Sequence, residues 1–363
     1  MLQGKRIWID LEHQKAAVML KPLIDMFYIN NVDLFITARD MGNNWEVIRE
    51  LGLRPEWIGK HGGAILAGKL AASIERMKGL LPAVGNFKPD LVLTFSSVEA
   101  IRIAFGLGVP SVSFNDEPRS TAVARLTLPL ASMVIVPRCV PEQLYLDLGA
   151  SRARMRRYDG IDEIAWISRF KPGDHVLAGV GVEKGKYVVI RTEMTHASYL
   201  SSTMRPEESR IIDFLPQLVK ACPGYKFIVI PRIDTQFEHL RHQFVHLNNV
   251  VVTNYVACLQ DVMFYSALVM SGGGTIARES ALMGVPTIEF FPGETAPQEH
   301  FLIDNGFPLW HVRDPVEIAA KAIEILSTSR QFDAGFKARL KEHEDPATVC
   351  HEEITKQLTG VKK

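Results

Sequence analysis

The chain has 363 residues, enough for two domains of ordinary size, and 47% of them are hydrophobic, so it is not a disordered chain. Its 41 lysine and arginine residues balance 41 aspartate and glutamate residues, which argues against a nucleic-acid-binding protein with a broad basic face. The four cysteines are isolated, as in reduced cytoplasmic proteins, and no apolar run approaches the roughly 20 residues of a membrane span. We therefore expect a cytoplasmic protein with no integral membrane segment.

Short apolar runs alternate with longer amphipathic stretches along the first half of the chain. The runs predict buried parallel strands at residues 7–10, 34–37, 91–94, 111–114 and 133–136. The stretches between them predict helices, among them 16–30, 64–81 and 98–106. This alternation is typical of right-handed βαβ units, so we predict a parallel sheet with helices on both faces.

The same pattern restarts after a looser stretch at residues 159–186. Further strands are predicted at residues 187–191, 227–230, 250–252, 267–270 and 286–290. We predict an N-terminal domain over 1–160, a C-terminal domain over 161–345, and a last helix within 346–363 that packs back on the N-terminal domain. Both domains are expected to be doubly wound, Rossmann-like parallel sheets that face each other across a cleft, with ligands at the carboxyl ends of the strands.

The most informative segment, residues 271–286, follows a predicted strand and opens a helix. Its three consecutive glycines let the backbone approach a ligand, and the positive helix end that follows suits a diphosphate. Glu279 lies about one turn into the helix, where a carboxylate can accept hydrogen bonds from ribose hydroxyls. The plain alternative is a tight structural turn, with Glu279 paired to Arg278 or to a lysine. The residues assigned here to the nucleotide sugar are Ser271, Gly272, Gly273, Gly274, Thr275, Arg278 and Glu279.

This segment resembles the nucleotide-sugar signature of GT-B proteins, including the peptidoglycan N-acetylglucosaminyltransferases and the UDP-N-acetylglucosamine 2-epimerases. In those families the glycine loop meets the diphosphate and the helix glutamate binds ribose. The chain resembles still more closely a mainly archaeal family, domain of unknown function 354. That resemblance implies an α/β fold of GT-B type without a settled reaction, and it rests on segments 8–10, 21–23, 37–40, 59–63, 114–116, 126–129 and 274–279.

One position departs from the family pattern. The loop after the first strand carries Asn-Pro-Pro-His in the family, whereas this chain reads His13-Gln14-Lys15-Ala16. A histidine role at that exact position therefore does not carry over.

Polar residues also follow two strands of the first domain. Asp10 and His13 come after the first strand, and His13 is a candidate general base because imidazole titrates near neutral pH. Its alternative role is a helix cap. Asn115, Asp116 and Glu117 follow a later strand, where a carboxylate could deprotonate an acceptor or hold substrate hydroxyls. Asp116 could equally cap the helix expected near residue 118.

Three further loops are candidates. His61, Gly62 and Gly63 lie in a glycine-rich loop that could clamp an acceptor or a phosphate, or could be a plain turn. Arg191 ends the first strand of the second domain, where its guanidinium could bind the diphosphate or form a structural ion pair with Glu193. The loop after the strand that follows the glycine motif offers donor-sugar contacts at Glu294, Gln298 and His300.

No metal site is predicted. His239, His242 and His246 share one helical face, but the charged residues among them favour a solvated face.

The sequence thus predicts a glycosyltransferase that uses a nucleotide-sugar donor, with UDP favoured, and that needs no cofactor besides this donor. Asp116, His13 or Asp10 would act on the acceptor. Two alternatives stay open: a non-hydrolysing UDP-N-acetylglucosamine 2-epimerase and a non-catalytic nucleotide-sugar-binding protein. A dehydrogenase is disfavoured, since no GxGxxG follows the first strand. The sugar, the acceptor, the stereochemical outcome and the oligomeric state, a homo-oligomer included, are left open.

Overall fold

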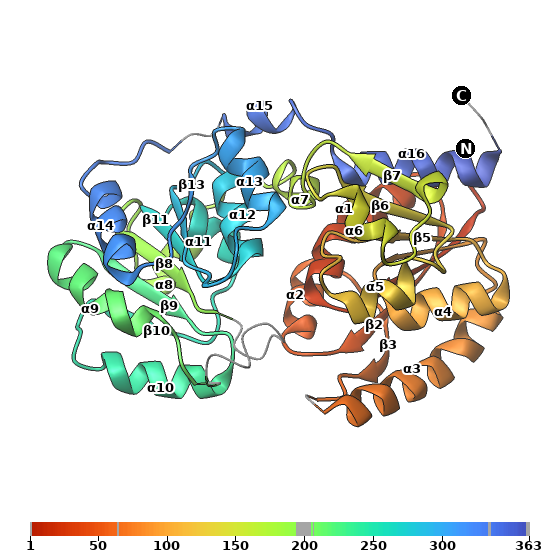
Figure 1. Cartoon of the computed structure of the whole chain (residues 1–363), viewed down its shortest axis with the longest axis horizontal. Helices are drawn as coiled ribbons and strands as arrows, with labels where there is room; N and C mark the ends of the chain where they lie inside the picture. The colour runs from red at the N-terminus through yellow and green to blue at the C-terminus, as the bar shows by residue number, and fades with distance from the viewer. Residues whose placement is uncertain (1, 64, 194–204, 206, 333–334, 361–363) are drawn as a thin grey trace. The chain divides into compact units, whose positions relative to one another are not determined.

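The computed structural model of the chain describes residues 2–63, 65–193, 205, 207–332 and 335–360. The chain forms two compact units (Figure 1). The first unit comprises Met1–Trp166 together with Lys341–Lys363, and the second comprises Ile167–Leu340. The end of the chain therefore belongs to the unit in which the chain begins.

The first unit is built on a seven-stranded parallel sheet of order β3-β2-β1-β4-β5-β6-β7. Its strands are β1 (Arg6–Leu11), β2 (Asp33–Asp40), β3 (Glu56–Lys60), β4 (Leu91–Phe95), β5 (Ser111–Phe114), β6 (Met133–Pro137) and β7 (Met155–Tyr158). The five strands predicted in this half are confirmed. The two edge strands, β3 and β7, were not predicted, because each contains two charged residues that interrupt or flank its apolar run, which edge strands tolerate.

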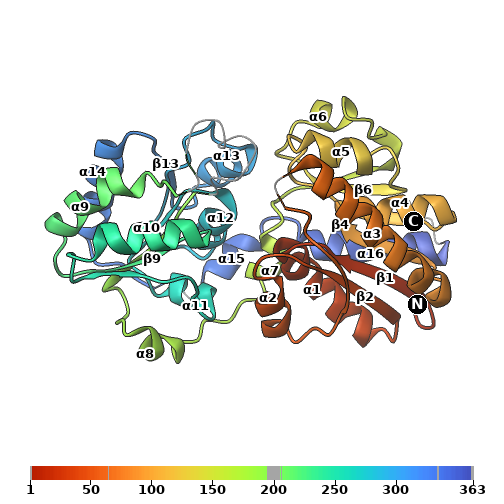
Figure 2. The same cartoon turned by 90° about the horizontal axis from the view of Figure 1, so that it is seen from below.

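The helices of the first unit lie on both faces of this sheet. α1 contacts α2 and α16, while α3 contacts α4 and α4 contacts α5. Right-handed crossovers place these two groups on opposite faces of the sheet (Figures 1 and 2). The helices are α1 (Gln14–Ile29), α2 (Asn44–Glu50), α3 (Leu66–Phe87), α4 (Val98–Leu107), α5 (Thr121–Thr127), α6 (Glu142–Leu146), the short 3₁₀ helix Arg152–Arg154, α7 (Ile164–Ile167), which runs into the second unit, and α16 (Pro346–Thr359).

The second unit contains a six-stranded parallel sheet of order β10-β9-β8-β11-β12-β13. Its strands are β8 (Tyr187–Arg191), β9 (Lys226–Ile230), β10 (Val250–Val252), β11 (Leu268–Ser271), β12 (Thr287–Glu289) and β13 (Leu309–His311). All but β13 were predicted. Its helices are α8 (Val176–Val180), α9 (Ile211–Ala221), α10 (Asp234–Phe244), α11 (Leu259–Phe264), α12 (Gly274–Leu282), α13 (Pro297–Asp304), α14 (Pro315–Leu326) and α15 (Phe336–Leu340).

Helix α9 shows why the second unit folds as it does. Its buried residues Ile211, Phe214, Leu215 and Leu218 follow the spacing of one helical face. They join the main hydrophobic cluster of the unit, in which the rings of Phe214 and Phe290 lie 5.3 Å apart. Burial of this face against β8 and β9 and contact with α14 hold the unit together.

The C-terminal segment is tied to the first unit by specific contacts. One carboxylate oxygen of Glu344 accepts from the Arg156 guanidinium at 2.6 Å, and the other accepts from the backbone N–H of Asp159 at 2.6 Å. α16 then packs against α1, with the rings of His351 and Phe27 5.6 Å apart. Among the residues that the structure describes, no helix is long and apolar enough to cross a membrane.

A buried ion pair links α3 to the end of β1. The Arg76 guanidinium donates to both carboxylate oxygens of Asp10, at 2.6 and 3.1 Å, and lies 3.3 Å from Glu99. Thr37 adds a hydrogen bond to Asp10 at 2.6 Å. Burial by itself raises the pKa of Asp10, but the charge and hydrogen bonds of Arg76, with those of Ser97 and Thr37, bring it below its ordinary value. Asp10 is therefore ionised and fully buried.

Replacing Arg76 by methionine leaves the Asp10 carboxylate buried without its counter-charge. We expect the free energy of unfolding of the first unit to fall by about 3–5 kcal/mol, measured by urea denaturation. Lys21→Met, which removes the more exposed pair with Asp25, is the matched control and should cost about 0.5 kcal/mol or less. Equal losses for the two variants would contradict a stabilising role of the buried pair.

Candidate functional site

Both sheets reverse their strand order at one point. In the first sheet β1 lies beside β4, and in the second β8 lies beside β11. Helices leave such neighbouring strands toward opposite faces, which opens a crevice at their carboxyl ends, where ligands of doubly wound folds bind. The segments at these ends are 10–13 and 96–97 in the first unit and 191–193 and 271–275 in the second.

The glycine motif forms the turn between β11 and α12. The Ser271 hydroxyl accepts from the N–H of Gly273 at 3.2 Å and donates to its carbonyl at 2.7 Å, which closes the turn. Gly273 occupies the N-cap position of α12 and has no side chain that could cap the first helical turn. The first N–H groups of α12 and its positive dipole end thus suit an anionic ligand.

Close packing explains why this turn needs glycines. A Cβ atom on Gly272 would lie 2.5 Å from Cγ of Glu193, and one on Gly274 would lie 2.6 Å from a carboxylate oxygen of Glu299. A Cβ atom on Gly273 would lie 2.9 Å from a guanidinium nitrogen of Arg232. The Arg232 side chain therefore reaches the start of α12.

Two arginines carry positive charge to this edge. The Arg191 guanidinium donates to the carbonyls of Ile230 and Pro231, at 3.2 and 2.7 Å. Arg232 donates through Nε to the carbonyl of Thr192 at 3.1 Å. Burial, with the nearby charge of Arg232, lowers the pKa of Arg191 to about 9. Like charges held beside a helix N-terminus favour binding of an anion.

Arg232 was missed at the sequence level. It follows β9, the strand beside β8, so it reaches the same sheet edge as Arg191. The available signal was its place two residues beyond the strand predicted at 227–230, but site residues were predicted only in the loops after the first, fourth and fifth strands of this domain.

Glu279 is buried on α12 and accepts a hydrogen bond from the amide of Gln260 at 3.2 Å. The alternative partner named for it, Arg278, instead pairs with Glu299 at 2.8 Å. Gln260 therefore orients the carboxylate that the sequence assigned to ribose.

Of the three residues predicted for a sugar-binding loop, only Glu294 lies in a loop, because Gln298 and His300 belong to the first turn of α13. Gln298 is buried, whereas Glu294 and His300 are exposed. The buried Glu299, which the sequence analysis did not select, is the residue that reaches α12 through Arg278.

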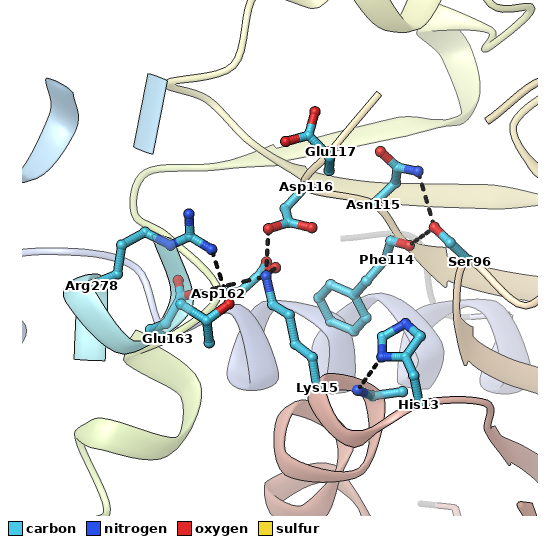
Figure 3. A network of polar contacts seen from close by, with 12 residues as sticks. His13, Lys15, Ser96, Phe114, Asn115, Asp116, Glu117, Asp162, Glu163 and Arg278 are labelled. Carbon is cyan, nitrogen blue, oxygen red and sulfur yellow. Dashed lines mark hydrogen bonds and ion pairs between the residues drawn. The ribbon is translucent and has the colours of Figure 1, made fainter. Parts of the chain in front are cut away.

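The first unit contains a different cluster, in which three carboxylates surround the ammonium group of Lys15 (Figure 3). Lys15 Nζ lies 2.9 Å from Asp162 and 3.7 Å from Glu163, and it donates a short hydrogen bond to Asp116. The Tyr158 hydroxyl donates to Asp162. Burial raises the pKa of Asp162 to about 6; Lys15 opposes this rise, while Asp116 and Glu163 add to it. The cluster can hold a proton near neutral pH.

Sequence reasoning selected only Asp116 from this cluster. Lys15 lies at the start of α1, Asp116 follows β5, and Asp162 and Glu163 follow the unpredicted strand β7. Without β7 in the predicted sheet, nothing placed the Asp162–Glu163 pair at the same edge.

His13 is the N-cap residue of α1. Its Nδ1 accepts from the N–H of Ala16 at 3.1 Å, so the neutral ring carries its proton on Nε2. Burial and the charge of Lys15 lower the pKa of His13 to about 4. The helix-cap alternative is confirmed, and in this tautomer the ring donates at Nε2 and cannot accept a proton there.

The residues beside Asp116 hold its loop in place. The side-chain amide of Asn115 donates to the hydroxyl of Ser96 at 3.0 Å. The backbone carbonyl of Asn115 accepts from the hydroxyl of Tyr145 at 3.0 Å. Glu117 pairs with Arg119. The expectation that Asp116 caps the next helix is wrong, because α5 begins at Thr121 with Ser120 at the N-cap position.

The loop after β3 closes on α3. Gly62 packs directly against the backbone of Gly68, and Gly63 has a positive φ of 79°. The exposed His61 accepts at Nδ1 from the N–H of Gly63 at 3.2 Å.

Across the described ranges, no three histidine, cysteine, aspartate or glutamate side chains are arranged to hold a metal ion.

A family model described as protein of unknown function (DUF354) matches residues 5–359. The chain belongs to the DUF354 family. An uncharacterized protein of Methanocaldococcus jannaschii, MJ0665, is 27% identical over 97% of this chain and 98% of its own length.

Solved structures share the fold of this DUF354 protein. UDP-GlcNAc 2-epimerase of Methanocaldococcus jannaschii, in complex with UDP-GlcNAc and UDP, superposes with a TM-score of 0.72 at 15% identity, over 98% of this chain and all of its own. The glycotransferase of kitacinnamycin has a TM-score of 0.61 at 15% identity, over 98% of this chain and 99% of its own. The expected GT-B type fold, with two doubly wound parallel sheets, is confirmed.

His13 should make stability depend on acid in a specific window. Because its pKa is about 4 in the folded chain and 6.5 ordinarily, only the unfolded chain binds this proton between those values, and stability falls as the pH drops through them. Asparagine also caps helices but does not titrate. We expect His13→Asn to match the parent protein at neutral pH and to exceed it by about 1–2 kcal/mol near pH 4.5, measured by urea unfolding. Parallel pH profiles would contradict this.

Proposed function

We propose that this protein is a glycosyltransferase whose second unit binds a nucleotide sugar, with UDP as the favoured nucleotide. The observation that carries the proposal is the anion site at the start of α12, where the uncapped helix N-terminus meets the guanidinium of Arg232. The presence of this site on a fold shared with UDP-sugar enzymes supports a diphosphate as its ligand. Arg191 adds charge at the same edge.

In this proposal Glu279 accepts hydrogen bonds from the ribose hydroxyls. Its carboxylate is oriented by Gln260, and its place on the second turn of α12 sets it beyond the diphosphate site. The donor needs no metal, because the helix N-terminus and the arginines stabilise the negative charge that develops on the departing diphosphate.

The first unit supplies the proton chemistry. A carboxylate of the Lys15 cluster takes the proton of an acceptor hydroxyl while the hydroxyl oxygen attacks the anomeric carbon; the bond from that carbon to the diphosphate breaks, and UDP leaves. Asp116 is the proposed base. His13 is unsuited because its cap hydrogen bond uses Nδ1, and Asp10 is unsuited because Arg76 occupies both its oxygens.

Arg232→Met removes the guanidinium from the start of α12. We expect the affinity for UDP to fall about 10- to 100-fold in calorimetric titrations, the usual effect of losing a charge-assisted hydrogen bond to phosphate. Arg241→Met, on an exposed position of α10 in the same unit, should bind UDP as the parent protein does. Equal UDP affinity for the two variants would contradict the proposed diphosphate site.

Asp116→Asn keeps the shape of the side chain but removes its basicity. We expect kcat for sugar transfer to fall at least about 100-fold, with the affinity for UDP unchanged, since the base acts only in the chemical step. Asp25→Asn, in an exposed pair of the same unit, is the control. A kcat that stays within a few fold of the parent enzyme would rule out Asp116 as the base.

A 2-epimerase is the second candidate, and the Lys15 cluster favours it specifically. Three carboxylates around one ammonium can keep one member protonated while another stays basic, as an acid–base exchange at a sugar carbon requires. Incubation with UDP-GlcNAc and no acceptor separates the two reactions. Formation of the 2-epimer would show that the protein is an epimerase and contradict the transferase proposal. Unchanged UDP-GlcNAc would favour the transferase.

A further inference from the structure

Helix α3 presents apolar side chains on its outer face. It buries only Arg76, Leu80 and Val84 of its 22 residues. Leu66, Leu70 and Ile74 are spaced by four residues, so they lie along one side of the helix, and they are 81%, 64% and 50% exposed. Neighbouring exposed residues are Ile65 and Leu81. An amphipathic helix of a globular protein ordinarily turns its apolar side chains toward the core and its charged side chains toward the solvent.

The next two helices of the layer continue this surface. α3 contacts α4 and α4 contacts α5, and these helices belong to the first unit (Figure 2). α4 exposes Phe105 and Leu107, and α5 exposes Val123 and Leu126. We call the outer surface of these three helices the α3–α5 face. Exposed apolar residues are ordinarily scattered, so a gathering of this kind marks a surface that binds something.

The charges on this face are mostly of one sign. The exposed charged residues within the three helices are Lys69, Lys78, Arg102 and Arg125, against Glu75 alone. Lys78 lies 3.8 Å from Glu75, a weak exposed pair. The whole chain carries as many acidic as basic residues, so this excess is local.

We infer that the α3–α5 face binds the surface of a membrane that contains anionic lipids. The apolar side chains would enter the region between headgroups and acyl chains, while the lysines and arginines reach the lipid phosphates. Each basic residue near an anionic surface adds to the attraction. Attachment of this kind lies in the plane of the interface and needs no spanning helix.

Charge complementarity selects this occupant over a second copy of the chain. In a two-fold symmetric dimer the same face would meet itself, so the basic residues of one copy would oppose those of the other. A bilayer surface with anionic headgroups offers the opposite sign over the whole face. The inference goes beyond the proposed function and does not depend on whether UDP-sugars bind.

The test is co-sedimentation of the full chain with lipid vesicles. One set contains phosphatidylcholine alone, and the other contains equal amounts of phosphatidylcholine and phosphatidylglycerol. We expect binding to the anionic set that weakens as salt is added. The variant Leu66→Ser, Leu70→Ser, Ile74→Ser should bind at least about tenfold more weakly.

The matched control replaces three exposed apolar residues of the second unit, as Val245→Ser, Ile303→Ser, Val316→Ser, and should bind like the parent protein. All six positions are exposed, so both variants should keep the thermal midpoint of the parent protein. Lys69→Glu with Arg125→Glu should weaken binding to the anionic vesicles, which separates the charge contribution from the apolar one.

Two outcomes would overturn the inference. One is equal vesicle binding by the α3 variant and its control. The other is a parent protein that does not bind anionic vesicles. If that protein is a dimer that the α3 variant dissociates, the α3–α5 face is a self-association surface instead.

Discussion

A parallel sheet brings the carboxyl ends of all its strands to one edge, and this constraint determines where polar chemistry can gather in both units. In the second unit, Arg191 ends β8, Arg232 follows β9 and the glycine turn follows β11, so all three lie at one edge of the sheet. In the first unit, the segments after β1, β5 and β7 deliver Lys15, Asp116 and the Asp162–Glu163 pair. Residues separated by up to about 150 positions in the chain thereby share one cluster, without any local sequence motif.

The two edges carry opposite chemistry. In the second unit, the N–H groups at the start of α12 and the Arg232 guanidinium concentrate positive charge, and Arg191 adds charge at the same sheet edge, a pattern that favours a phosphate. Around Lys15, burial raises the pKa of Asp162, and the neighbouring Asp116 and Glu163 carboxylates add to the rise, so the cluster can hold a proton near neutral pH. The buried Asp10–Arg76 pair fixes α3 to β1 and so stabilises the sheet of the first unit. The edge of the second unit thus suits the stabilisation of negative charge, and the edge of the first suits proton transfer.

Apolar periodicity predicted the nine interior strands of the two sheets, because strands covered on both faces must be hydrophobic, and it also predicted the edge strand β10, whose sequence is Val-Val-Val. It failed for β3, β7 and β13, which lie at sheet edges where polar residues are tolerated. The glycine turn between β11 and α12 was predictable because it is one contiguous segment between a strand and a helix. Arg232, Lys15 and Asp162 were not, since their proximity arises from strand order, which the sequence does not encode locally. His13 shows a further limit: its type suggested a base, but one hydrogen bond to Ala16 fixes its tautomer.

The most direct test of the central claim is amide hydrogen exchange of the second unit, measured with and without a UDP-sugar. The α12 N-terminus should bind the diphosphate through its N–H groups, so exchange at residues 272–276 should slow when the ligand is added, while α14 of the same unit should exchange as before. Unchanged exchange at 272–276 in the presence of ligand, or protection confined to another part of the chain, would contradict the account.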